Sequence, residues 1–69
     1  MIKKFHATNY MKGQIQWQLP QLVNDGSIMF EKGTSRNKYI IIIDETKIDH
    51  RNLKYLYDKL IPANREIRD

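Results

Sequence analysis

Four consecutive isoleucines at positions 40–43 constrain the fold of this chain more than any other feature of its sequence. Branched apolar side chains favour strands, so the run predicts a strand over residues 39–43. Successive side chains of a strand point to opposite faces, and both faces of this strand are therefore apolar. A chain of 69 residues has room for one domain and about one covering layer. The sequence thus raises the question of what covers the second face.

Two more strands are predicted before the isoleucine run. The segment GQIQWQL alternates glutamine with Ile15, Trp17 and Leu19, and this period of two predicts a strand that buries those three side chains. The sequence NDG at 24–26 is typical of a tight turn, so we expect a hairpin that leads into a strand over 28–32. A glycine-containing turn then leads into the isoleucine strand. The result is a meander of three antiparallel strands.

A helix is predicted after the isoleucine strand. Its apolar stripe has helical spacing and consists of Leu53, Leu56, Tyr57, Leu60 and Ile61. Asp49 is the predicted N-cap, and Ile48 and Leu53 then occupy the two positions of a hydrophobic staple. Pro62 disfavours helical geometry at the residue before it, so the helix is expected to end there.

The predicted fold class is therefore α+β: a three- or four-stranded antiparallel β-meander packed against one C-terminal α-helix. The fourth strand depends on the N-terminal segment IKKFHAT, whose alternation permits a short edge strand. The single small domain spans residues 1–69, with 62–69 as a short charged tail.

One face of such a sheet is left without a helix. The residues predicted to lie on it, and to bind a partner, are Gln14, Gln16, Gln18, Met29, Ile40 and Ile42. Three occupants remain open at this stage. They are the N-terminal segment with Phe5, Tyr10 and Met11, a second copy of the chain as a homodimer, or a different protein.

The charge distribution suggests another class of partner. The net charge is +4, and the first 24 residues contain three lysines and no acidic residue. Such a segment attracts phosphate by long-range steering. The residues expected to contact nucleic acid in this alternative are Lys3, Lys4, Lys12, Arg36 and Lys38.

The sequence carries no motif for catalysis. It has no nucleophile elbow, no zinc-protease motif and no glycine-rich phosphate loop, so we expect neither an enzyme nor a cofactor or metal site. Asp25 and the sequence Glu45-Thr46-Lys47 share an order with some magnesium-dependent nucleases, but the pattern is too common to indicate a metal site. The chain has no cysteine, no signal-peptide pattern and no apolar run of membrane-spanning length, so a cytoplasmic protein without membrane contact is expected.

These observations favour a small non-enzymatic binding protein that acts through protein–protein interaction. Its richness in Ile, Lys, Asn and Asp suggests an AT-rich genome, and hence a phage or mobile-element protein that inhibits or redirects a host enzyme. The alternative is a small basic nucleic-acid-binding protein that uses its sheet or its N-terminal basic segment.

Overall fold

The strand that contains the isoleucine run lies at the centre of the sheet. The sheet has the order β1-β3-β2, and β3 (Lys38–Asp44) pairs antiparallel with β1 (Ile2–Thr8) and with β2 (Ile28–Lys32). Ile41 and Ile43 of β3 are completely buried. The backbone groups of alternate residues of β3 face β1, and those of the remaining residues face β2. In the central position, the backbone N–H and C=O groups on both edges of β3 therefore have hydrogen-bond partners.

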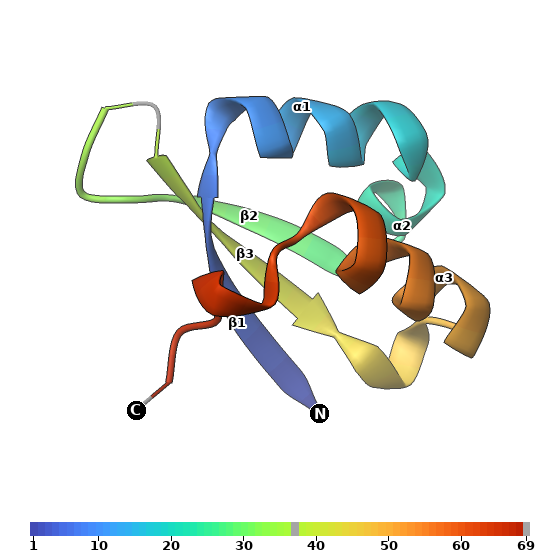
Figure 1. Cartoon of the computed structure of the whole chain (residues 1–69). Coiled ribbons are helices and arrows are strands. Elements are labelled where there is room, and N and C mark those ends of the chain that lie inside the picture. Colours follow the sequence, from blue (N-terminus) through green and yellow to red (C-terminus); the bar gives the residue numbers. More distant parts are fainter. Residues whose placement is uncertain (37, 69) are drawn as a thin grey trace.

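Figure 1 shows this computed structural model, which describes residues 1–36 and 38–68. Two helices lie between β1 and β2 in the chain, and a third follows β3. The helices are α1 (Asn9–Gln18), α2 (Pro20–Asn24) and α3 (His50–Tyr55). A π-helical turn (Leu56–Leu60) extends α3, and short 3-10 turns occupy Glu45–Lys47 and Ala63–Arg65. The α+β class is confirmed.

The strand predicted over 14–19 is wrong, because residues 14–18 form the second half of α1 and Leu19 is its C-cap. Met11, Ile15 and Leu19 follow one another at intervals of four, and all three are buried. Thr8 caps the helix through its Oγ1 atom, which accepts the backbone N–H of Met11 at 3.2 Å. A helix places Trp17 on the side opposite Ile15, and Trp17 is accordingly exposed instead of buried.

The sheet is not a pure meander. The segment 24–26 joins α2 to β2 and is not a hairpin turn, although Gly26 does adopt a positive φ of 84° there. The N-terminal strand is confirmed as β1, which lies at an edge of the sheet and pairs with β3. β1 and β2 are joined by two helices and are not neighbours in the sheet. β3, which follows both in the sequence, lies between them.

The C-terminal helix begins and ends where the sequence predicts. Asp49 caps it, with Oδ1 accepting the backbone N–H of Asn52 at 2.8 Å. Ile48 is buried, as its position in a hydrophobic staple requires. The last turn widens, since the N–H of Ile61 donates to the carbonyl of Leu56 five residues earlier at 2.9 Å. Extended backbone follows at Ile61, directly before the proline.

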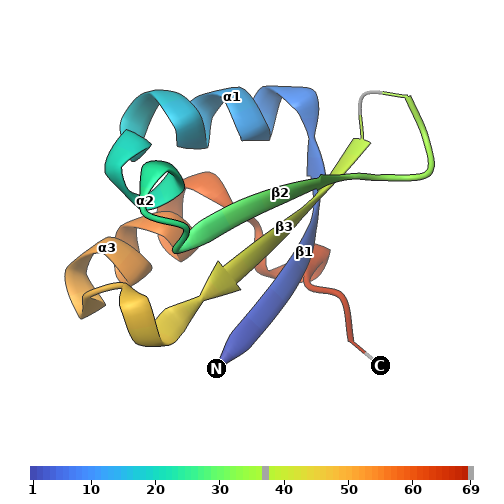
Figure 2. The ribbon, with the colours of Figure 1, turned by 180° about the vertical axis from the view of Figure 1, so that it is seen from behind.

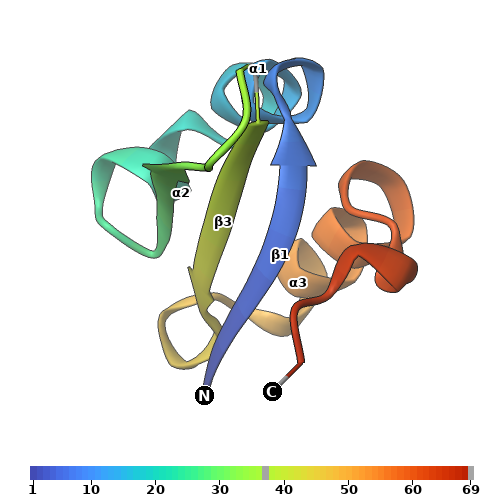
Figure 3. The ribbon, with the colours of Figure 1, turned by 90° about the vertical axis from the view of Figure 1, so that its left-hand side faces the viewer.

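The C-terminal segment packs against the free edge of β1. The N–H of Ile67 donates to the carbonyl of Lys4 at 2.8 Å, and Glu66 forms an antiparallel bridge with Phe5. Figure 3 shows this segment running beside β1. Glu66 and Ile67, within the segment predicted to be a charged tail, therefore contribute to the edge of the sheet.

All three helices lie on one face of the sheet. Figure 1 shows them above and to the right of the strands, and Figure 2 shows the same separation from behind. A single apolar core fills the space between the two layers. Its members are Phe5, Ala7, Met11, Ile15, Leu19, Leu22, Ile28, Ile41, Ile43, Ile48, Leu56 and Ile61. The opposite face of the sheet carries no helix of the described chain.

The Asp49 cap gives a direct test of the C-terminal helix. Replacing Asp49 with Ala removes the acceptor for the Asn52 N–H, so the free energy of unfolding is expected to fall by about 1 kcal/mol. Urea denaturation of both proteins measures the change. Asp49→Asn retains a capping oxygen and is the matched control. An equal decrease in both variants would show that the cap does not contribute through this hydrogen bond.

Candidate functional site

The face of the sheet without helices carries apolar side chains at its centre. The register places Lys4, Ile42 and Met29 in one row across the three strands. The next row contains His6, Ile40 and Glu31. We call the residues of these two rows, together with Ile2, the open face. Met29 is 56% exposed and Ile2 is 54% exposed, whereas Ile40 and Ile42 are half-buried by their neighbours.

The N-terminal segment does not cover the open face. Phe5 and Ala7 point to the helical side and are buried in the core, and Met11 is buried on the side of α1 that faces the core. Tyr10 is exposed on α1. One of the three occupants that the sequence leaves open is therefore excluded. Within the described chain, only the C-terminal segment reaches the margin of this face, where Ile67 and Ile40 line a common surface hollow.

The six residues predicted to bind a partner do not form one surface. Met29, Ile40 and Ile42 share the open face, as the alternation of the strands requires. The three glutamines lie on α1 instead, because that segment is a helix and covers the other side of the sheet. Gln18 donates through Nε2 to Gln14 Oε1 at 2.9 Å and accepts the hydroxyl of Tyr55. Gln18 thus links α1 to α3.

The five residues of the nucleic-acid alternative are also separated. Lys3 and Lys12 make contacts within the chain. The Nζ atom of Lys12 lies 5.5 Å from the ring centroid of Phe30 and 5.1 Å from that of Tyr39, on the helical side of the sheet. The remaining three, Lys4, Arg36 and Lys38, are exposed.

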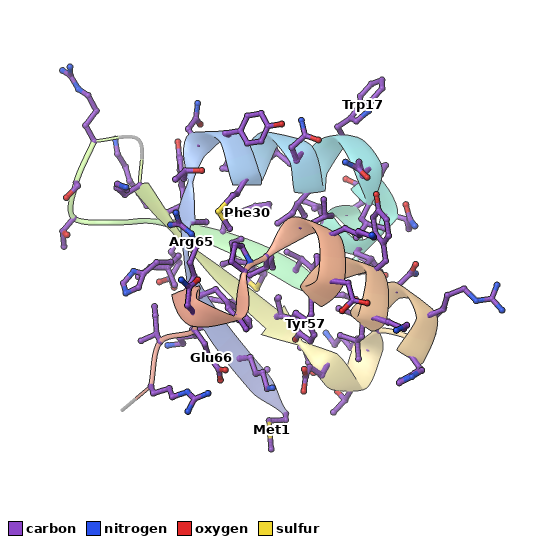
Figure 4. All side chains as sticks on the ribbon, in the orientation of Figure 1. Met1, Trp17, Phe30, Tyr57, Arg65 and Glu66 are labelled. Carbon is purple, nitrogen blue, oxygen red and sulfur yellow. The ribbon has the colours of Figure 1, made fainter. Side chains whose placement is uncertain are left out.

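Lys3 belongs to a cluster that links β1 to the C-terminal helix. Its Nζ atom lies 3.8 Å from Glu45 Oε2 and 5.7 Å from the ring centroid of Tyr57. The Tyr57 hydroxyl donates to the same Glu45 oxygen at 2.6 Å, and the Tyr57 ring packs against Phe5 with centroids 5.6 Å apart. Partial burial, and then the hydrogen bond to Glu45, raise the pKa of Tyr57. Figure 4 shows Tyr57 between the helix and the sheet. Lys3 and Glu45 therefore help to hold β1 against the C-terminal helix.

Two large aromatic side chains on α1 were not predicted to be exposed. Trp17 is 80% exposed and Tyr10 is 74% exposed, and Figure 4 shows Trp17 pointing away from the molecule. Gly13 lies between them on the same face of the helix, and a Cβ atom there would meet nothing within 4 Å. The interval of four between Met11, Ile15 and Leu19 is the signal that would have identified this outer face.

The acidic side chains near β3 are engaged in contacts within the chain. Among the described residues, no group of three or more His, Asp or Glu side chains could hold a metal ion. The Asp44 carboxylate accepts the Thr46 hydroxyl at 2.6 Å and the Thr46 N–H at 3.1 Å, and these bonds lower its pKa. Asp44 therefore acts as a cap for the turn after β3. Glu45 accepts a hydrogen bond from Tyr57 and pairs with Lys3. Asp44 and Glu45 thus both make contacts that stabilise the fold.

Comparison of the chain with protein-family models, with curated proteins and with solved structures found no match. In the part of the chain that the structure describes, every helix is too short or too polar to cross a membrane. The candidate site is therefore assigned from the structure of this chain alone, and the open face is that site.

Removing the Tyr57 hydroxyl tests the cluster around Glu45. Tyr57→Phe is expected to lower the free energy of unfolding by roughly 1–2 kcal/mol near neutral pH, because Glu45 loses a donor. The pKa of Tyr57 is higher in the folded than in the unfolded state, so the stabilisation is complete below the unfolded pKa of about 10 and decreases above it.

Urea denaturation from about pH 8 to pH 11 measures this dependence. The difference between the wild type and Tyr57→Phe is expected to shrink above about pH 10. Tyr10→Phe removes an exposed hydroxyl and is the control. A constant difference across the whole range would contradict a raised pKa for Tyr57.

Proposed function

We propose that this protein is a non-enzymatic binding protein whose open face docks another protein. The observation that carries the proposal is the exposure of Met29 and Ile2 beside Ile40 and Ile42 on a sheet face without helices. Contiguous apolar surface of this kind on a small domain is typical of an interaction site. Covering it would bury side chains that the chain itself leaves in contact with water.

The composition of the open face supports a protein partner. An apolar centre with a charged margin is the usual arrangement of a protein interface. Lys4 and His6 border the isoleucines on β1, and Glu31 borders them on β2. The two margins therefore differ in charge, which favours one orientation of the partner over others.

The edge formed by β2 offers a second means of contact. The N–H of Asp44 donates to the carbonyl of Ser27 and the N–H of Gly33 donates to the carbonyl of Lys38, each at 2.9 Å. Residues at odd positions of β2 thus face β3, and the backbone groups of Ile28, Phe30 and Lys32 point outward. No described strand lies beyond them. A partner strand added here would extend the sheet and lie next to the open face.

Met29→Lys tests the proposal. Met29 points away from the core, so a lysine there remains solvated and the variant is expected to stay folded by circular dichroism. The charge at the centre of the patch should abolish self-association in sedimentation experiments, or capture of a protein partner from nuclease-treated lysate. Tyr10→Lys places the same charge on α1 and is the matched control. Unchanged association and capture by Met29→Lys would contradict the proposal.

Nucleic-acid binding is the second candidate function. Lys4 and Lys38 both have even positions on paired strands and lie on the same side of the sheet, and Arg36 is exposed in the hairpin loop beside Lys38. These three residues form no ion pair among the described residues. They supply a basic border to the open face that phosphate groups can approach.

A salt titration distinguishes the two functions. If phosphate binding dominates, affinity for DNA or RNA falls steeply with salt. Replacing Lys4, Arg36 and Lys38 with Gln should then reduce the slope of log K against log salt by about one for each phosphate that the variant no longer neutralises. A variant with Gln at Lys47, Lys54 and Lys59 has the same net charge and is the control. Equal slopes for both variants would indicate only diffuse attraction.

A further inference from the structure

A hollow lies at the hairpin end of the sheet, between β1, the loop from β2 to β3, and the 3-10 turn after the C-terminal helix. Its volume is about 380 Å³. Three basic side chains from these different elements line it, namely His6, Lys38 and Arg65. Thr34 and Ser35 add two hydroxyl groups from the loop. Segments far apart in the sequence therefore bring positive charge and hydrogen-bond donors together at one place.

The positive charge of the hollow is not neutralised within the described chain. No acidic side chain lines it, and neither Lys38 nor Arg65 forms an ion pair with a described residue. Arg65 is half-buried, and Figure 4 shows it on the side of the molecule that carries the hairpin loop. The neighbouring Glu66 pairs with Arg68 at 3.7 Å. The nearest acid on the open face is Glu31, which Ile40 separates from His6.

The shape of the hollow depends on Gly33. Its N–H donates to the carbonyl of Lys38 at 2.9 Å, and a Cβ atom at this position would lie 3.1 Å from that same oxygen. Glycine therefore lets the loop close tightly beside Lys38. Tyr39 and Ile40 supply an apolar wall next to the basic groups. The hollow thus combines an anion site with a surface for an organic group.

We propose that this hollow binds a phosphate monoester of about the size of a mononucleotide. A monoester carries a charge of about −1.5 to −2 at neutral pH, which suits the two cations Lys38 and Arg65 better than the single charge of a phosphate diester. The planar guanidinium of Arg65 can bind two phosphate oxygens at once, and Lys38 adds a point charge. The volume lies within the range usual for small-molecule sites. The hollow shares His6 and Ile40 with the open face, but the proposal depends on Arg65, Lys38 and the loop hydroxyl groups and not on the docking of a protein at the open face.

Titration of isotopically labelled protein followed by amide chemical shifts tests the site. The probes are inorganic phosphate, a nucleoside 5′-monophosphate and the corresponding nucleoside without phosphate. The monophosphate is expected to shift the amides of Gly33, Thr34, Lys38 and Arg65 in a saturable manner. Its affinity should exceed that of the nucleoside by at least roughly tenfold, since the nucleoside lacks the phosphate that accepts charge-assisted hydrogen bonds.

Two variants locate the binding groups. Arg65→Gln and Lys38→Gln should each weaken monophosphate binding by roughly tenfold. Lys59→Gln removes the same charge from an exposed position of the C-terminal helix and should change the affinity less than about twofold. Lys38 is exposed, so its variant remains informative if Arg65→Gln disturbs the C-terminal segment. Equal weakening by the control would overturn the proposal.

Short oligonucleotides distinguish the source of the phosphate. A 5′-phosphorylated strand that binds the hollow more tightly than its unphosphorylated form supports the site and identifies a strand terminus as its ligand. Tighter binding of the free monophosphate than of either strand supports a small-molecule ligand. An unphosphorylated strand that binds as tightly as the monophosphate would overturn the preference for a monoester.

Discussion

The fold depends on the burial of Ile41 and Ile43 at the centre of the sheet. These side chains point toward the helices, and the two strands that flank β3 place Phe5, Ala7 and Ile28 around them. Full burial of an aliphatic side chain contributes about 1.5–3 kcal/mol, a large share of the net stability of so small a domain. The helices can cover only one face, so the alternation that buries Ile41 and Ile43 leaves Ile40 and Ile42 without a helix above them.

Much of the fold could be predicted from local signals. The isoleucine run, the strand at 28–32 and the cap at Asp49 each depend on neighbouring residues, and the structure confirms them. The prediction of a strand over 14–19 was wrong because the apolar residues of this segment fit both the period of a strand and the period of a helix. Ile15 and Leu19 are buried under both interpretations, and only Trp17 distinguishes a strand from a helix. The buried side chain of Met11, one turn earlier, favours the helix, whereas Gly13 lowers its propensity.

The candidate site was predictable only where it follows from strand alternation. Met29, Ile40 and Ile42 share a face because strands alternate, whatever the order of strands in the sheet. The basic hollow could not be predicted, since it requires Arg65 to lie near the hairpin loop. That position depends on the pairing of the C-terminal segment with β1 through Glu66 and Ile67, which no local pattern in this charged segment indicates. The same limit applies to Lys12, whose aromatic contacts require α1 to lie over β2 and β3.

The docking of the C-terminal segment on β1 makes the two edges of the sheet unequal. Ile67 occupies the middle of the β1 edge, whereas the outward backbone groups of β2 meet no described strand. A molecule with two free edges can add neighbours without end and form a fibre. With one edge occupied, a pairing through β2 uses the free edge of both molecules and closes on itself as a two-fold dimer. Glu66 and Ile67 thus limit any assembly of this kind to a finite size.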